Sequence, residues 1–224
     1  LNFQDLPDEL ALRILSYSET KDLISCGRVS KKIRRISRDS ILWVTVNLEK
    51  KIVTTELLEM ILKKGCRTLN LCNSTVLGSL SSNAKSQLRV LNLSQIRETW
   101  FLEELLFSCC SLQHLVMDGV FLTPKMAVSI CKNGKTLQIL SLKSSNLDSL
   151  ATSAYNDLQD IIKCCQELRE VDLADGLSND DVGFLAENLT PNVGKLNLSG
   201  GFITDLSRIM MSKVYLAGAI KSKH

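Results

Sequence analysis

The sequence predicts an α/β fold in which a small helical block precedes a right-handed solenoid of short parallel strands and helices. Three observations support this prediction. A phrase of the form apolar-x-x-Leu-x-Leu recurs seven times from residue 43 onward, apolar residues at helical spacing separate most of the copies, and the residues before the first copy show only short helical patterns. We therefore divide the chain into a helical domain at residues 1–45, a solenoid of about seven units at residues 46–215, and a short basic tail at residues 216–224.

The helical block begins with a Leu-Pro pair, and Pro suits the first position of a helix because its φ angle is already fixed there. Three short helices are predicted from apolar residues at helical spacing: Leu10, Ile14 and Leu15 for the first, Leu23 and Ile24 for the second, and Val29, Ile33 and Ile36 for the third. A block of about 40 residues is too small to build a stable core alone, so we expect packing against a partner or against the adjoining repeats to stabilise it.

The strands are predicted from the central apolar residue of each repeated phrase. These residues are Val46, Leu69, Leu91, Leu115, Leu140, Val171 and Leu196. Their spacings are 23, 22, 24, 25, 31 and 25 residues. Five of the six spacings fall within the range of about 20–29 residues that is typical of leucine-rich repeats. The long spacing predicts an insertion of about six residues in the Ser-rich stretch 144–153.

Helices are predicted between the strands, around residues 57–62, 102–106, 126–131, 158–165, 182–189 and 206–210. Thr123-Pro124 is typical of an N-cap followed by Pro at the first helical position, and Ser178 before two acidic residues indicates another helix start. A single strand and helix cannot bury both of their apolar faces, so the units must stack around a shared Leu-lined core. Parallel strands are then expected on the concave side and helices on the convex side.

The residue between the two leucines of Leu-x-Leu points away from the core and onto the concave face. In chain order these residues are Asn47, Asn70, Asn92, Val116, Ser141, Asp172 and Asn197. We predict that this face binds a protein segment, although a row of small polar residues suits simple solvation equally well. The candidate contact residues are Asn70, Asn92, His114, Val116, Asp118, Ser141, Lys143, Asp172 and Asn197.

Charge and composition disfavour several classes of partner. The chain has 27 Lys plus Arg against 24 Asp plus Glu, a net charge of +3 that does not indicate nucleic acid or an anionic membrane. No apolar run approaches the ~20 residues of a membrane helix. The chain has eight Cys, and its first residues do not resemble a secretory signal. We expect reduced thiols in the cytoplasm or nucleus; the alternative is a disulfide-bonded extracellular receptor.

The sequence contains no convincing metal, cofactor or catalytic motif. Cys109-Cys110 and Cys164-Cys165 are adjacent pairs rather than Cys-x-x-Cys, and the chain has only two His residues. No His pairs with a given Cys as an activated nucleophile would require, and no phosphate-binding or dinucleotide-binding motif is present. We therefore expect no metal, no cofactor and no catalytic activity.

Several fixed offsets in the helical block resemble a known motif. Leu6-Pro7-x-Glu9-Leu10, followed by Ile14, Asp22-Leu23, Val29-Ser30-Lys31-Lys32 and Leu42-Trp43, is similar to an F-box. Cys109-x-x-Leu112 and Cys165-x-x-Leu168 match the cysteine at the helix ends of one subclass of leucine-rich repeat. Together these features resemble the F-box/leucine-rich-repeat receptors, and the likeness extends to about residue 201.

The resemblance implies a non-catalytic substrate receptor of an SCF-type cullin-RING ubiquitin ligase. The F-box would bind the Skp adaptor, and through it the cullin and RING subunits. The repeats would bind a protein substrate, possibly phosphorylated, for proteasomal degradation. The implied adaptor-binding residues are Leu6, Pro7, Leu10, Ile14, Leu15, Leu23, Val29, Leu42 and Trp43, the last two also joining the F-box to the first repeat. The alternative is a repeat scaffold that binds partners without recruiting a ligase.

Two positions depart from the family's pattern. Ile33 occupies a place where members usually have Trp, and it keeps the apolar character with less contact area. The chain also ends soon after its seventh repeat phrase, so the substrate and accessory-subunit contacts of longer members cannot be transferred to it.

Overall fold

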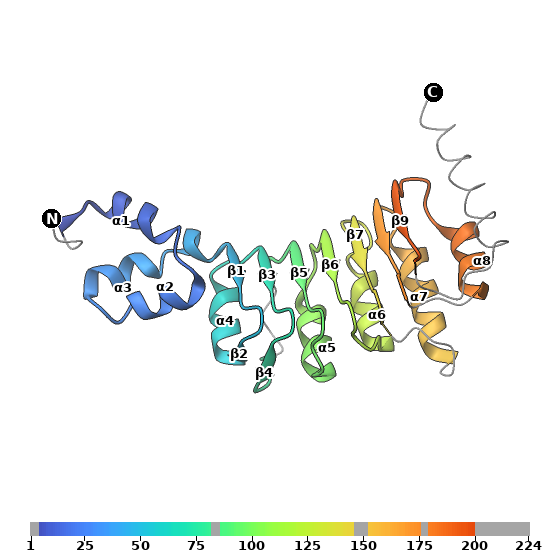
Figure 1. Ribbon diagram of the computed structural model, residues 1–224, viewed down its shortest axis with the longest axis horizontal. Coiled ribbons are helices and arrows are strands. Elements are labelled where there is room, and N and C mark those ends of the chain that lie inside the picture. Colours follow the sequence, from blue (N-terminus) through green and yellow to red (C-terminus); the bar gives the residue numbers. More distant parts are fainter. Residues whose placement is uncertain (1–4, 82–85, 146–151, 176–178, 200–224) are drawn as a thin grey trace, which may run out of the picture.

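The computed structural model describes residues 5–81, 86–145, 152–175 and 179–199. The first part is helical: α1 spans Asp8–Leu15, α2 Thr20–Cys26 and α3 Lys31–Ser37, followed by a short 3-10 turn at Ser40–Trp43. Figure 1 shows these helices as a separate block at the N-terminal end of a row of strands and helices. The three predicted helices are therefore confirmed, and Ile33 is buried within the block.

Seven short strands form one sheet in which every neighbouring pair is parallel. The strands are β1 (Thr45–Asn47), β3 (Thr68–Asn70), β5 (Val90–Asn92), β6 (His114–Val116), β7 (Ile139–Ser141), β8 (Glu170–Asp172) and β9 (Lys195–Asn197). The central residues of the repeated phrase lie directly opposite one another from Val46 to Leu196. The predicted leucine-rich-repeat register is confirmed across all seven strands.

Helices line the opposite side of this sheet, and the strand side is gently concave (Figure 1). They are α4 (Thr55–Lys63), α5 (Thr99–Ser108), α6 (Pro124–Cys131), α7 (Thr152–Cys164) and α8 (Asn179–Asn188). As predicted, Thr123 caps α6 by accepting a hydrogen bond from the Met126 N–H, with Pro124 next in the chain. Between α6 and α7, Gly134 allows close packing, because a Cβ there would lie 2.4 Å from the Cys164 carbonyl oxygen.

The second unit departs from the pattern of one strand and one helix. Between β3 and β5, the described residues form a short strand, β4 (Thr75–Leu77), and no helix. β4 pairs in parallel with β2 (Ile52–Thr54) in a small second sheet beside the main one. The predicted insertion falls largely on residues 146–151, and the helix predicted at 206–210, the end of the solenoid and the basic tail fall beyond residue 199. These segments lie outside the described residues.

A left-handed residue follows every strand from β1 to β8 of the main sheet and links each unit to the next. Positive φ angles between 48° and 68° occur at Lys50, Asn73, Gln95, Gly119, Ser144 and Asp175. The N–H of each donates to a backbone carbonyl of the following unit at 2.7–3.0 Å. The turn therefore continues the ladder of hydrogen bonds past the strand ends, and it uses Gly at one of these six positions only.

Trp43 joins the helical block to the first repeat. Its side chain is 3% exposed, and its indole N–H donates to the Ser37 carbonyl at 2.8 Å. Lys64, just after α4, places its ammonium group 5.6 Å from the centre of the Trp43 ring and donates to the Arg38 carbonyl. Leu42 is buried beside it. These contacts connect α3 with the first repeat, in the position that the sequence predicted for the pair.

Candidate functional site

Helix α1 carries apolar residues on two faces. Ala11 and Leu15 are buried against the rest of the block, whereas Leu10 and Ile14 are 50% and 48% exposed. Leu10 and Ile14 are four residues apart, so they lie next to each other on the outer face of the helix. The sequence predicted Leu10, Ile14 and Leu15 as one apolar stripe and as adaptor-binding residues. In the structure Leu10 and Ile14 are accessible to a partner, whereas Leu15 is buried.

Exposed apolar residues also occur in other parts of the block. Val29, between α2 and α3, is 68% exposed, Tyr17 after α1 is 82% exposed, and Pro7 is exposed. Tyr17 was missed by the sequence analysis, although it lies one helical turn beyond Ile14. We call Pro7, Leu10, Ile14, Tyr17 and Val29 the exposed apolar residues of the helical block.

The other predicted adaptor-binding residues are less accessible. Leu15 and Leu23 are 3% and 4% exposed, and Leu42 and Trp43 are buried at the junction with the repeats. Leu6 is half-buried. In this chain, Leu15 and Leu23 therefore have a packing role, and the accessible members of the predicted set are Leu6, Pro7, Leu10, Ile14 and Val29.

Ionic contacts hold α1 against α3. Asp8, in the first turn of α1, pairs with Arg35 and lies 3.7 Å from the Lys32 ammonium group. Lys32 also donates to the Leu6 carbonyl, and Arg34 donates to the Gly27 carbonyl at 2.7 Å. Three basic residues of α3 therefore form contacts within the block. The contacts of Asp8 hold α1 in one orientation on α3, with Leu10 and Ile14 on its outer face.

On the concave face, the predicted outward residues lie in one register-matched row. Five of the seven have a structural task that the sequence analysis did not foresee. Their Oδ1 atom accepts the N–H of the residue two positions later at 3.0–3.3 Å, as seen for Asn47, Asn70, Asn92, Asp172 and Asn197. Asn and Asp commonly cap turns in this way. This oxygen stabilises the turn after each strand, so it is not free for a ligand.

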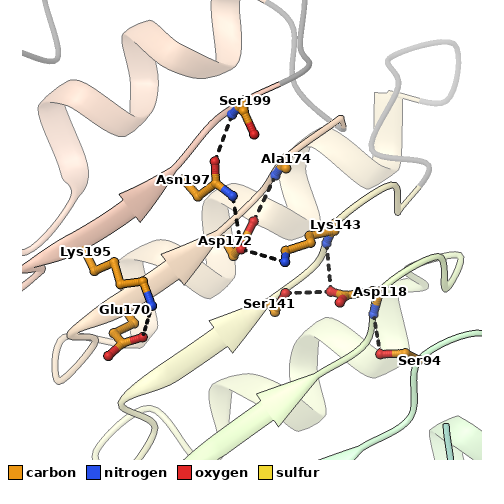
Figure 2. Close-up of polar contacts among 10 residues, drawn as sticks. All are labelled: Ser94, Asp118, Ser141, Lys143, Glu170, Asp172, Ala174, Lys195, Asn197 and Ser199. Carbon is orange, nitrogen blue, oxygen red and sulfur yellow. Dashed lines mark hydrogen bonds and ion pairs between the residues drawn. The ribbon is translucent and has the colours of Figure 1, made fainter.

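Val116 and Ser141 interrupt this row, and here the neighbouring unit supplies the missing cap (Figure 2). The Asp118 N–H, which an Asn at 116 would cap, donates to the Ser94 hydroxyl at 3.1 Å. Likewise, the Lys143 N–H donates to Asp118 Oδ1 at 3.1 Å, and the Ser141 hydroxyl donates to the same oxygen at 2.6 Å. Positions 116 and 141 are therefore released from the capping role that Asn performs elsewhere.

A hollow of about 250 Å³ opens over β6–β9. Its lining includes six of the predicted substrate-binding residues: Val116, Asp118, Ser141, Lys143, Asp172 and Asn197. The predicted residues Asn70, Asn92 and His114 lie on the same face but are not part of its lining. Ile139, Glu170 and Lys195 also line it and were missed. Each lies one residue before its unit's central apolar residue, so the period-two rule for strands could have identified them.

The charges in this hollow are mostly paired. The Lys143 ammonium group lies 3.0 Å from Asp172 Oδ2, and Lys195 lies 3.1 Å from Glu170 Oε2 (Figure 2). The Asn197 amide also donates to Asp172 Oδ2 at 3.2 Å. The hydrogen bond from Lys143 to Asp172, together with the negative charge of that carboxylate, raises the pKa of Lys143. The charged state of Lys143 is therefore stabilised by a carboxylate of the same face.

Three of the cysteines, Cys66, Cys109 and Cys165, are buried. Burial raises the pKa of Cys109 to about 11 and that of Cys165 to about 12, so neither is an activated nucleophile. Across the ranges that the structure describes, His, Cys, Asp and Glu form no group of three or more that could hold a metal ion. In the same ranges, every helix is too short or too polar to cross a membrane.

Comparison with known protein families gives a match in the N-terminal part of the chain. Residues 3–49 match the F-box-like family. The match covers α1–α3, the junction containing Trp43, and β1. The chain therefore carries an F-box-like domain at residues 3–49, followed by parallel strand-and-helix units of the leucine-rich-repeat type.

Proposed function

We propose that this protein is the substrate-recognition subunit of an SCF-type cullin-RING ubiquitin ligase. The observation that carries the proposal is the F-box-like domain with apolar side chains exposed on α1, because F-box domains bind the Skp adaptor. Through that adaptor the protein would join the cullin and RING subunits. Its own role would be non-catalytic, in the cytoplasm or nucleus, and the ubiquitin would be transferred by an enzyme held elsewhere in the complex.

The proposed adaptor-binding surface consists of the exposed apolar residues of the helical block, which is the F-box-like domain. About half of the Leu10 and Ile14 side chains is in contact with water, and burying such surface is favourable by about 25 cal/mol per Å². Adjacent exposed apolar side chains such as Leu10 and Ile14 on a small domain indicate a protein interface. Leu15, Leu23, Leu42 and Trp43 would contribute by holding α1 and the first repeat in place.

The repeats would hold the substrate while the F-box holds the ligase. The strands of the main sheet form a continuous ladder of parallel pairs from β1 to β9, which would keep the concave face at a fixed distance from the F-box. A rigid connection of this type raises the effective concentration of substrate lysines near the ubiquitin-charged enzyme. The substrate is proposed to bind on the concave face, and the hollow over β6–β9 is the part of that face with charged and apolar residues together.

A finer assignment within the family rests on sequence likeness. Pro7-Asp8-Glu9-Leu10, Val29-Ser30-Lys31, Leu42-Trp43 and Lys195-Leu196-Asn197-Leu198 are similar, in order and spacing, to the S-phase kinase-associated F-box protein. We infer from this likeness a role in degrading regulators of the cell cycle. Identification of the proteins that accumulate on the receptor is the measurement that tests it.

Affinity capture from cells treated with a proteasome inhibitor tests the main proposal. We expect the wild-type chain to capture the Skp adaptor and the cullin, and Leu10→Asp/Ile14→Asp to capture neither. Leu77→Asp is the matched control, because Leu77 is also 50% exposed but lies on β4, in the repeats. Equal capture of the adaptor by the wild type and the double variant would contradict the proposal. It would favour the alternative, a repeat scaffold that binds partners without recruiting a ligase.

A further inference from the structure

The hollow over β6–β9 has features that indicate which chemical class of substrate segment it accepts. At β1, β3, β5, β8 and β9, the outward Asn or Asp caps its own turn. At β6 and β7, the caps come from Ser94 and Asp118 of the preceding units instead. Positions 116 and 141 therefore need no capping side chain, and at 116 the sequence has the apolar Val.

Two apolar side chains form the floor of the hollow. Val116 on β6 and Ile139 on β7 are both half-buried and both line the hollow. Register places Ile139 opposite His114 on β6 and opposite Glu170 on β8, so the apolar pair is bordered by polar residues of adjacent strands. A hollow of about 250 Å³ has room for one or two side chains rather than for a folded element.

One of the three carboxylates around this floor forms no ion pair, although it adds to the negative potential at Lys143. The lining holds the acids Asp118, Glu170 and Asp172 and the bases Lys143 and Lys195. Each base pairs with one acid, which accounts for Asp172 and Glu170. Asp118 Oδ1 accepts two hydrogen bonds, but Asp118 has no cation within salt-bridge distance among the described residues, and its Oδ2 has no hydrogen-bond donor there either. The excess charge of the hollow is therefore negative.

From these features we infer that the hollow binds an extended segment carrying an apolar side chain next to Lys or Arg, and that it does not select a phosphorylated residue. The apolar side chain lies over Val116 and Ile139, and the basic group pairs with Asp118. A phosphate would have to displace Asp172 from Lys143 or Glu170 from Lys195, and it would meet the unpaired Asp118 carboxylate. This inference rests on the proposed function, because it names the substrate class of the same receptor.

Two substitutions remove the proposed contacts while keeping the fold. Asp118→Asn retains Oδ1 as the acceptor for Ser141 and Lys143 but removes the charge. Val116→Asn restores the capping residue that β1, β3, β5 and β9 already use. Asp175→Asn is the control, because it removes the same charge at an exposed left-handed turn position outside the lining, where Asn is well tolerated.

The test measures binding of the intact chain to immobilised synthetic peptides of about eight residues, long enough to cross several strands spaced about 4.8 Å apart. All peptides carry Leu at one position, and the next residue is Arg, Glu or phosphoserine. We expect the Leu-Arg peptides to bind best, and their binding to fall at least about tenfold in Val116→Asn and Asp118→Asn but not in Asp175→Asn.

Preference for phosphoserine or Glu, absence of any preference, or unchanged Leu-Arg binding in both site variants would overturn the inference. Capture of the purified Skp adaptor is measured on the same protein samples. Retained adaptor capture with the wrong peptide preference rejects only the substrate class. Loss of adaptor capture by the wild-type chain rejects the proposed function itself.

Discussion

The central leucines of the repeats and the apolar residues of α1 in the F-box block differ in how completely they are buried. In the repeats, the central leucines of β3, β5, β6 and β7 are at most 1% exposed, and the residues beside them on the concave face are mostly polar and hydrogen-bonded. In the F-box block, α1 buries Ala11 and Leu15 but leaves Leu10 and Ile14 half exposed. Stacking of the units therefore covers the central leucines of the repeats, whereas the packing of the block leaves two apolar residues of α1 half exposed.

Truncating one leucine in each region should give the largest difference in the free energy of unfolding. Leu115→Ala removes a fully buried side chain from the middle of the sheet and should lower the free energy of unfolding by about 2–5 kcal/mol. Leu10→Ala removes a half-exposed one and should change it by less than about 0.5 kcal/mol. Chemical denaturation followed by circular dichroism measures both. A loss for Leu10→Ala as large as that for Leu115→Ala would show that Leu10 is a core residue.

A smaller difference in the free energy of unfolding is expected between two outward positions of the concave face. Asn92→Ala removes the acceptor of the Ser94 N–H and should lower the free energy of unfolding by about 1 kcal/mol. Val116→Asn should not lower it, because the new side chain can cap the Asp118 N–H in the same manner as its neighbours. Thermal unfolding of the two variants and the wild type distinguishes them. Destabilisation by Val116→Asn would contradict the view that position 116 is free of a structural task.

The smallest effect concerns the adjacent cysteine pairs, whose members differ in burial. Cys110 and Cys164 are exposed, whereas burial raises the pKa of Cys109 from 9.0 to about 11 and that of Cys165 to about 12. Because the thiolate is the reactive form, iodoacetamide at pH 8 should modify Cys110 and Cys164 first. Peptide mass spectrometry against time measures the order of modification, and faster labelling of Cys109 than Cys110 would refute the burial.

The same shifts set the sign of a stability effect at high pH. Since the folded pKa values are raised, the contribution of the buried neutral thiols is complete below pH 9. It is lost as the pH rises from 9.0 towards about 11 for Cys109 and about 12 for Cys165.

The sequence predicted the sheet correctly because buried leucines at a fixed spacing determine a single register. It did not predict β4 in the second unit, since the Leu-x-Leu phrase describes only the strand of the main sheet. The sequence also did not separate the buried face of α1 from its exposed face. A run such as Leu10, Ile14 and Leu15 shows that the residues are apolar but not whether this chain or a partner buries them.

The capping role of the concave asparagines was missed for a related reason. An Asn in the outward position of a strand looks equally suited to solvent, ligand or turn, and only the backbone bend after the strand brings Oδ1 within 3.0 Å of the N–H two residues on. The exchanged caps at Ser94 and Asp118 join residues 24 or 25 positions apart, so a local pattern could not indicate them.

The most direct test of the account is a titration of purified Skp adaptor into the purified chain by calorimetry. The account predicts saturable binding for the wild type and for Leu77→Asp, and a loss of at least about 2 kcal/mol in binding free energy for Leu10→Asp/Ile14→Asp. Equal affinity of all three proteins, with each shown to be folded, would contradict the claim that the exposed face of α1 binds the ligase.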